Sequence, residues 1–270
     1  MILNRFSISP FGAQRAGQAL GGLLVFATLA GTAQAQVKND GLWRGAGGAA
    51  LAIASGNTST QAFSASIDMA NATTRDKITL GAGINYGSSK VNGNSSTTAN
   101  RWAGAGQYDY NLSARIYVFG KLGLEGDEVA DLSWRSTLAA GLGYKLIESQ
   151  AMTLSVFGGA GYSTDKYDVN QTIGDKTAKR FSRASLLLGE ESSYQLSATT
   201  TFKQRLEIYP GLSGDKAVLA KFNASLAVAM SNTLSLTAGL TNSYNSKPPL
   251  GNKKSDVGLF MGVNLKIGAP

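Results

Sequence analysis

Residues 257–267, Val-Gly-Leu-Phe-Met-Gly-Val-Asn-Leu-Lys-Ile, change character at every second position. Val257, Leu259, Met261, Val263, Leu265 and Ile267 share one parity, and glycine, phenylalanine, asparagine and lysine occupy the other. A β-strand points alternate side chains to opposite faces of its sheet. The stretch therefore predicts a strand with one apolar face and one mixed to polar face.

The same alternation recurs along the chain, with little sign of helical periodicity. It predicts twelve strands, at residues 42–55, 59–71, 75–88, 98–112, 114–126, 131–147, 151–164, 180–194, 198–210, 216–230, 233–246 and 255–268. An even number of strands is typical of single-chain bacterial barrels. The expected fold class is all-β: a closed antiparallel transmembrane β-barrel of about twelve strands, with both termini in the periplasm.

A soluble β-sandwich is the alternative, because it also contains alternating strands. Many of the predicted strands reach ten residues or more, and a tilted strand needs about 9–11 residues to cross a bilayer. Trp134 and Tyr144 have the same parity and lie ten residues apart. At a tilt of about 40° this span is roughly 25 Å high, as is the apolar band between the aromatic girdles of a membrane barrel. These features favour the barrel.

The connections are expected to alternate in length, as in outer-membrane barrels. Short periplasmic turns are predicted near Thr73, Ser113, Gln150, Ala198 and Ser231. Longer external loops are predicted at Lys90–Thr97, Asp165–Lys179 and Lys247–Lys254. The first external connection, at residues 56–58, is short and departs from this trend.

The first 35 residues have the features of a secretory signal peptide. Arg5 and Arg15 are their only charges, an apolar run follows from Ala19 to Ala30, and Ala33-Gln34-Ala35 offers a cleavage site. The apolar run is shorter than the ~20 residues that a spanning helix needs. An anchored amphipathic helix is the alternative. We predict a cleaved signal peptide at residues 1–35, one barrel domain at residues 36–270, and a location in the outer membrane of a Gram-negative envelope.

Composition argues against several classes of function. Removal of Arg5 and Arg15 with the signal peptide leaves 23 of the 25 lysines and arginines, against 17 acidic residues. The basic residues form no cluster, so nucleic acid is not an expected partner. The chain has no histidine and no cysteine, which excludes Ser-His catalysis and thiol nucleophiles. The acidic group Asp127, Glu128 and Asp131 is expected to be a solvated turn. We expect no enzyme activity, no metal and no cofactor.

The polar faces of the predicted strands carry charges that would line the lumen of a barrel. These are Arg101, Asp109, Arg115, Lys121, Arg135, Lys145, Lys203, Arg205, Glu207 and Lys221. If the lumen is filled with water, its excess of basic residues favours anions. Alternatively, Arg115, Arg135, Lys203 and Arg205 pair with Asp109, Glu125, Glu190 or Glu207 and fill the interior. A narrow, anion-favouring channel and a structural envelope role therefore both stay open.

Two loop motifs resemble those of a known family. Ser55-Gly56-Asn57-Thr58 resembles the Gly-Asn-Thr turn of the salt-induced outer-membrane proteins, a family of largely unknown function. Residues 244–256, Tyr-Asn-Ser-Lys-Pro-Pro-Leu-Gly-Asn-Lys-Lys-Ser-Asp, resemble its final Pro-Pro loop, and Gly141-Leu142-Gly143-Tyr144 is also similar. The resemblance implies a small outer-membrane barrel without known catalytic residues. The chain ends Ile267-Gly268-Ala269-Pro270, without the terminal aromatic residue that is usual in outer-membrane barrels.

A surface-loop binding or adhesion module is the alternative function. Asp165, Asp168, Asn170 and Asp175 offer oxygen ligands, but their spacing lacks the pattern of a calcium loop. The expected partners of such a barrel are outer-membrane lipid, lipopolysaccharide and the barrel-assembly machinery, with small solutes or ions as candidates for transport.

Overall fold

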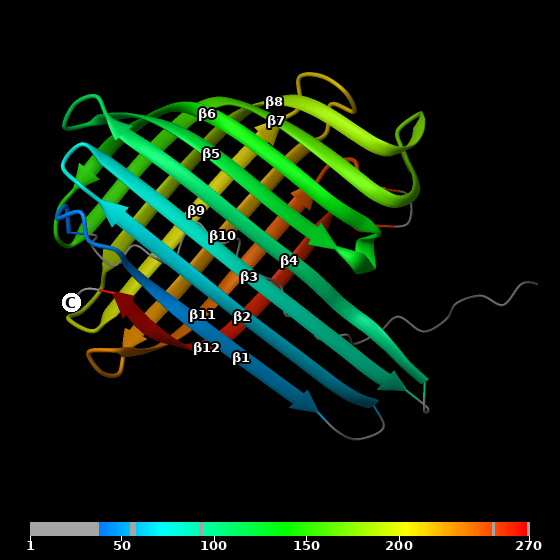
Figure 1. The fold of residues 1–270 in the computed structure, drawn as a ribbon, viewed down its shortest axis with the longest axis horizontal. Helices are drawn as coiled ribbons and strands as arrows, with labels where there is room; N and C mark the ends of the chain where they lie inside the picture. The colour runs from blue at the N-terminus through cyan, green and yellow to red at the C-terminus, as the bar shows by residue number, and fades with distance from the viewer. Residues whose placement is uncertain (1–37, 55–57, 92–93, 250–251, 269–270) are drawn as a thin grey trace, which may run out of the picture.

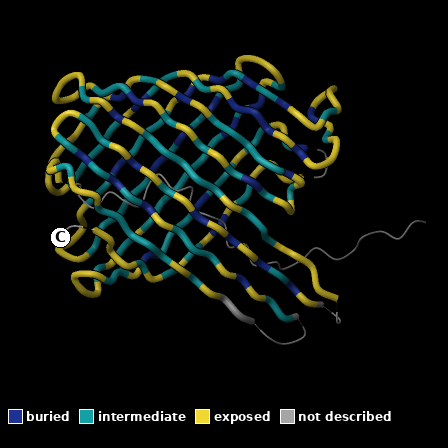
Figure 2. The backbone as a smooth tube through the Cα atoms, in the orientation of Figure 1, coloured by how far each residue is buried: buried dark blue, intermediate teal, exposed yellow. Residues whose placement is uncertain are grey.

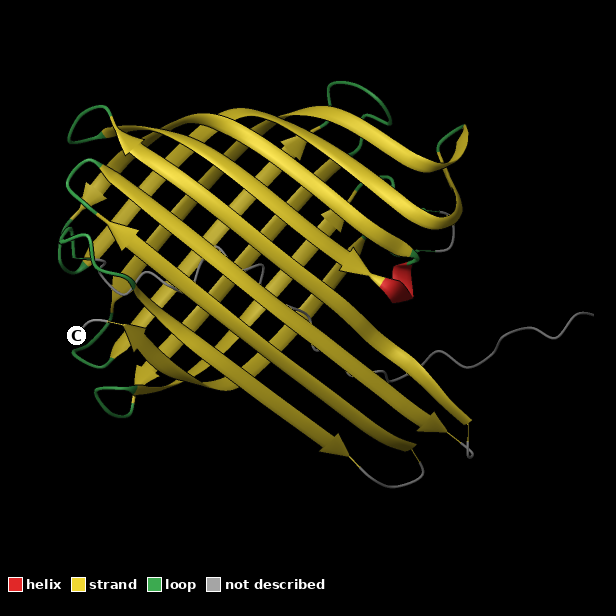
Figure 3. Ribbon diagram, viewed as in Figure 1, coloured by secondary structure: helices red, strands yellow, loops and turns green. Residues whose placement is uncertain are grey.

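A computed structural model describes residues 38–54, 58–91, 94–249 and 252–268 of the chain. Within these ranges the chain forms twelve β-strands and one short 3-10 helix (Figures 1 and 3). The strands are β1 (Arg44–Ala54), β2 (Thr58–Ala72), β3 (Asp76–Val91), β4 (Asn94–Asn111), β5 (Ile116–Asp127), β6 (Leu132–Glu148), β7 (Met152–Ile173), β8 (Lys176–Gln195), β9 (Thr200–Pro210), β10 (Val218–Ala229), β11 (Leu234–Asn245) and β12 (Ser255–Gly268). The helix, η1 (Glu128–Ala130), connects β5 to β6.

The sheet closes on itself. Every strand pairs antiparallel with the next one along the chain, and β1 completes the circle by pairing with β12. This closing seam runs from Arg44 opposite Gly268 to Ala49 opposite Val263. The twelve-strand antiparallel barrel is therefore confirmed, and the sandwich is excluded.

The barrel is apolar outside and polar inside. Leu259 and Met261 on β12 are 68% and 66% exposed, whereas the charged residues Asp165 and Arg183 are 0% and 2% exposed. Figure 2 shows the alternation of exposed and covered positions along the strands. Burial of charges beneath an exposed apolar surface is the reverse of the arrangement in a water-soluble protein. It suits a sheet whose outer face contacts lipid.

Aromatic side chains inside the barrel lie over glycines on the neighbouring strand. Phe157 faces Gly189 across β7 and β8, Tyr117 faces Gly143 across β5 and β6, and Phe260 faces Gly239 across β12 and β11. A Cβ atom at Gly189 would lie 2.4 Å from the Phe157 ring and 2.7 Å from the Leu206 carbonyl oxygen. Because glycine has no side chain, these positions leave the space that the aromatic rings occupy on the inner face.

The short turns lie where they were expected, at residues 73–75, 112–115, 149–151, 196–199 and 230–233. Two of the three predicted long loops are wrong. Most of Asp165–Lys179 continues β7 and β8 to a two-residue turn at Gly174, which has φ +60°. Most of Lys90–Thr97 likewise continues β3 and β4. The outward face of these segments is polar, so their apolar alternation stops although both segments remain strands. The β7–β8 ladder is interrupted between Lys166 and Gln171.

The connection at Lys247–Lys254 is confirmed within the described residues. The predicted signal peptide and the Gly56-Asn57 part of the first turn lie outside the described residues. Within the described residues, no helical segment has the length and apolar character needed to cross a membrane.

We predict that Gly189→Ala destabilises the barrel by about 1–3 kcal/mol, the usual cost of overpacking a filled interior. The added methyl group would collide with both the Phe157 ring and the backbone of β9. Urea unfolding of protein reconstituted in lipid vesicles, followed by tryptophan fluorescence, measures the change.

Gly123→Ala on β5 is the matched control. It lies on the inner face, but its new Cβ would meet nothing closer than the Thr137 carbonyl oxygen at 4.0 Å. Equal unfolding midpoints for the two variants would contradict the proposed packing role of Gly189.

Candidate functional site in the barrel lumen

In the part of the chain that the structure describes, side-chain bridges cross the lumen between distant strands. The Lys121 ammonium on β5 donates to both Glu207 carboxylate oxygens on β9, at 2.5 and 2.8 Å. Lys221 on β10 donates to Glu125 on β5 at 2.9 Å. Three strands separate β5 from β9 around the barrel, and four separate β5 from β10. The bridges therefore connect opposing walls and not neighbouring strands.

Arg205 on β9 makes the third bridge, from its Nη2 to the Gln107 side-chain oxygen on β4 at 3.1 Å. The same guanidinium pairs with Glu191 on β8 and lies over the Phe157 ring, with its Cζ 4.9 Å from the ring centroid. One planar cation thus contacts three other strands. A guanidinium suits this position because its five donors have a fixed geometry and its face stacks on aromatic rings.

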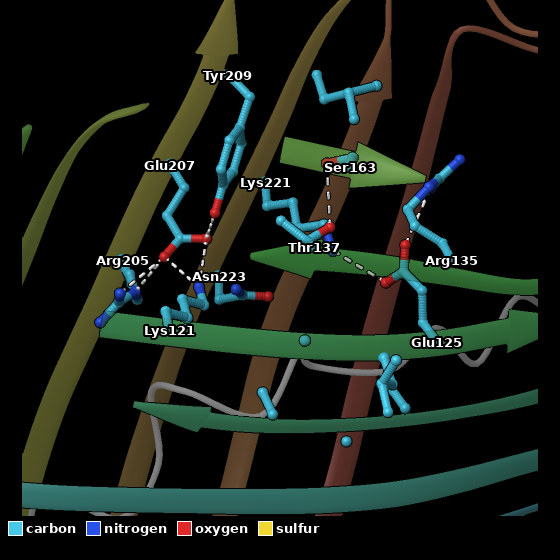
Figure 4. A pocket seen from close by; sticks show the side chains of 16 residues that line it. Lys121, Glu125, Arg135, Thr137, Ser163, Arg205, Glu207, Tyr209, Lys221 and Asn223 are labelled. Carbon is cyan, nitrogen blue, oxygen red and sulfur yellow. Dashed lines mark hydrogen bonds and ion pairs between the residues drawn. The ribbon is translucent and has the colours of Figure 1, made fainter. Parts of the chain in front are cut away.

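Glu207 is the acceptor at the centre of this group. Besides Lys121, it accepts from Arg205 Nε at 2.9 Å, from Arg205 Nη2 at 2.7 Å and from the Tyr209 hydroxyl at 3.0 Å (Figure 4). Glu207 is only 4% exposed. A buried carboxylate is tolerated when its oxygens receive several charged or polar donors.

A second group of charges is centred on Arg135 of β6. Its guanidinium binds Asp165 with two hydrogen bonds of 2.7 and 2.9 Å, and it donates to Glu125 at 2.9 Å. Asp165 also accepts from Arg183, which lies 3.3 Å from Asp215 in the β9–β10 connection. Because Glu125 also holds Lys221, the second group is joined to the transluminal bridges.

An apolar cluster packs beside these charges on the same wall. It consists of Phe119, Ala139, Phe157, Leu187, Tyr209 and Leu219, with Tyr117 against it. The rings of Phe119 and Phe157 meet edge to face at 5.7 Å between centroids. This wall of the lumen is therefore filled by packed side chains.

The described residues border a central cavity and a larger cavity inside the barrel. A central cavity of about 60 Å³ is bordered by the cations Lys121, Arg135, Arg205 and Lys221 and by the carboxylates Glu125 and Glu207 (Figure 4). A larger cavity of about 300 Å³ lies at the short-turn end, among Lys77, Asp109, Lys145, Glu148 and Glu191. Gln107 and Glu191 line the second cavity and hold Arg205, which lines the first. Arg205 therefore stands between the two cavities.

The structure brings five of the ten predicted lumen residues together at the central cavity: Lys121, Arg135, Arg205, Glu207 and Lys221. Four others lie elsewhere on the inner side. Arg101 pairs with Asp127 at 2.5 Å, Asp109 with Lys77 at 3.7 Å, and Lys145 with Glu148 at 3.3 Å. Lys203 shares the strand and the parity of Arg205.

Arg115 is a wrong prediction. It lies in the turn before β5, is exposed, and donates to the hydroxyl of Tyr144 on the exposed face at 3.4 Å. The turn ends the alternation, so parity no longer directs this side chain. The expected pairing of Glu190 with a basic lumen residue is also wrong, because Glu190 accepts a hydrogen bond from the Gln204 side chain at 2.9 Å. The expected pairs of Arg135 with Glu125 and of Arg205 with Glu207 are confirmed.

Several residues of the network were not predicted as such. Gln107 shares its parity with Asp109 on β4, and Tyr209 shares its parity with Glu207 on β9, so alternation alone marks these two residues. Glu191 lies on β8, for which no lumen residue was predicted. Asp165 was considered as a cation ligand in a loop, but it lies in β7 and is occupied by two arginines. Asp215 lies in a connection, where the sequence offers no signal.

Three of the other acidic residues singled out in the sequence also have structural partners. Asp127 pairs with Arg101 and accepts from the Ala130 backbone, and Glu128 accepts from Asn100. Asp168 accepts from the Ser133 hydroxyl at 2.5 Å. In the part of the chain that the structure describes, no three acidic side chains converge as a metal site.

A closed barrel with an apolar exterior and a charged interior defines a transmembrane β-barrel of the outer-membrane type. More specifically, the chain belongs to the family described as "Protein of unknown function, DUF481", whose model matches residues 47–267. This assignment is consistent with the resemblance noted in the sequence, although the family description contains no reference to salt.

Comparison with solved structures gives similar barrels at low sequence identity. The translocator domain of the autotransporter NalP from Neisseria meningitidis is 13% identical, with a TM-score of 0.46, over 87% of this chain and 90% of that one. An outer membrane channel from Pseudomonas putida F1 is 11% identical, with a TM-score of 0.46, over 85% of this chain and 96% of that one. No curated protein sequence matches significantly.

We predict that Asp165→Asn lowers the free energy of unfolding by about 3 kcal/mol, because it leaves buried arginines undercompensated. Asp165 is 0% exposed and binds both Arg135 and Arg183. Urea unfolding in lipid vesicles provides the measurement.

Asp168→Asn is the matched control, since it removes the same charge three residues along β7. Asp168 is exposed, so its loss is expected to change stability by no more than about 0.5 kcal/mol. A similar loss for both variants would show that net charge, and not the buried network, causes the effect.

Proposed function

We propose that the protein is a narrow channel that favours small anions, with the transluminal bridges as its constriction. The observation that carries the proposal is the charge around the central cavity, where four cations face two carboxylates. Rings of basic side chains favour anions in pores. Two further carboxylates, Asp165 and Glu191, hold Arg135 and Arg205 from outside the lining. The excess of cations at the cavity surface, and not a net charge of the whole network, is therefore expected to set the preference of the pore.

The size of the constriction restricts the solutes that can pass. The central cavity has a volume of about 60 Å³, which has room for only a few water molecules, since about 10–15 Å³ is enough to hold one. Only small ions and solutes would pass without movement of the bridging side chains. We therefore infer a low conductance that depends on the positions of Arg205, Lys121 and Lys221.

A structural role in the envelope is the second candidate function. The filled wall around Phe157 and the bridges between opposite walls support it, because both brace the barrel. In this case no unitary current is expected from purified protein. For either role we propose a non-enzymatic function, since the chain lacks histidine and cysteine.

Planar-bilayer recording of the purified protein tests the channel. We expect small unitary currents. In a KCl gradient, the reversal potential should lie between zero and the equilibrium potential of chloride. Substitution of both Lys121 and Lys221 by Gln leaves two cations and two carboxylates at the cavity, so the reversal potential should move toward zero. The absence of any unitary current from folded wild-type protein would refute the channel and favour the structural role.

The matched control is the double variant Lys176→Gln with Lys179→Gln. It removes the same charge from the exposed β7–β8 hairpin, away from the lumen. We expect its reversal potential to equal that of the wild type. A shift as large as that of the lumen variant would contradict selection at the constriction.

Gln107→Ala tests the constriction without a change of charge. It removes the acceptor on β4 that Arg205 reaches across the lumen. We expect a higher unitary conductance with an unchanged reversal potential. Gln204→Ala on β9, whose side chain bonds Glu190, is the control and should leave the conductance as it is. Equal conductances for both variants and the wild type would show that the bridge between Arg205 and Gln107 does not restrict conduction.

A further inference from the structure

A row of basic and aromatic side chains crosses β6, β7 and β8 on the outer face of the barrel. Trp134 lies opposite Lys166 in the β6–β7 ladder, and Lys166 lies opposite Arg180 in the β7–β8 ladder. Both cations are exposed, and they share the outward parity of Tyr162 and Leu186, which are 53% and 43% exposed. The row therefore lies on the outer face of the barrel, the same face that carries the apolar band further from the β7–β8 hairpin.

Two cations directly opposite each other in a sheet destabilise it unless something offsets their repulsion. Neither Lys166 nor Arg180 forms an ion pair with a carboxylate among the residues that the structure describes. On the same strand, Asp165 is held by Arg135 and Arg183, and Asp168 accepts from Ser133. The charge of the row is therefore available to an external anion.

The ring of Trp134 positions Arg180. Arg180 lies over the Trp134 ring, with its Cζ 5.9 Å from the centroid, and so reaches across β7. The next outward row toward the membrane consists of the hydroxyl residues Ser136, Thr164 and Ser182, of which Thr164 and Ser182 bond each other at 3.1 Å. Guanidinium and ammonium groups are typical donors to phosphate oxygens.

Below the hydroxyl row the surface becomes apolar. Leu138, Tyr162 and Ala184 form the next row, and Leu138 is 61% exposed. Tryptophan is enriched at the edge of the apolar band, at the level of lipid headgroups. A ligand with a phosphate group and an acyl chain would satisfy the cations and cover the apolar row at once.

We propose that Lys166 and Arg180, with Trp134 beside them, form a binding site on the barrel exterior for the phosphate of a membrane-lipid headgroup. The chemistry recognised is a phosphate ester at the membrane boundary, with its acyl chains along Leu138 and Tyr162. This site is independent of the lumen and of the proposed channel.

Quenching of Trp134 by brominated lipids tests the proposal. In a Trp43→Phe, Trp102→Phe background, Trp134 is the only tryptophan of the chain. The protein is placed in phosphatidylcholine nanodiscs that contain brominated phosphatidylglycerol or brominated phosphatidylcholine at the same mole fraction. We expect the anionic lipid to be preferred at Trp134 by about fivefold for each cation, as is typical for basic residues at an anionic membrane surface.

Lys166→Gln with Arg180→Gln should abolish the preference, and Lys166→Gln alone should reduce it while Arg180 stays over the ring. Lys166→Arg should retain it. Lys179→Gln is the matched control on the same hairpin, because the Lys179 ammonium already donates to the Asp168 carbonyl at 2.8 Å. Equal quenching by both lipids in the unsubstituted background, or loss of the preference in Lys179→Gln, would overturn the site.

A separate measurement distinguishes lipid phosphate from free phosphate. Inorganic phosphate is added to the protein in nanodiscs of phosphatidylcholine alone, with Trp134 emission as the readout. We expect no change at millimolar concentrations. A saturable change that disappears in the double variant would show a site for soluble phosphate and would overturn the assignment to lipid.

Discussion

The hydrogen-bond ladder of this sheet has to close, because lipid offers no partner for an unpaired backbone group. The pairing of β1 with β12 provides this closure. Closure divides the side chains into an outer set that meets lipid and an inner set that does not. It also brings opposing walls near enough for Lys121 to reach Glu207 and for Arg205 to reach Gln107. The charged network is thus a consequence of the closed sheet.

Burial of charges in such an interior is costly unless each is matched by several partners. The network meets this condition because each carboxylate pairs with two cations. Glu125 pairs with Arg135 and Lys221, and Glu207 pairs with Lys121 and Arg205. Neutral donors and acceptors complete the shell, as Tyr209 and Gln107 do. Shared partners make the groups interdependent, so a substitution at one site changes the environment of its neighbours.

The strands and the two faces of the barrel could be predicted from alternation alone, since period two is a local property of the backbone. The pairs across the lumen could not. Parity places Gln107 and Arg205 on the inner face, but whether they meet depends on strand tilt and on the stagger between distant strands. The β7–β8 hairpin was mistaken for a loop because its strands leave the membrane and lose their apolar face. Arg115 was misplaced because alternation ends at a turn.

The transluminal bridges also bear on the order in which the protein is assembled. Lys121 and Glu207 are separated by 86 residues, and Glu125 and Lys221 by 96, whereas neighbouring strands pair through short connections. Hairpins can therefore form as soon as their two strands exist, but the bridges must wait for the far wall. Until then, unpaired charges would face the interior of an open sheet, which disfavours its transfer into lipid. This cost would favour transfer into lipid after the far wall has joined the sheet, and not before.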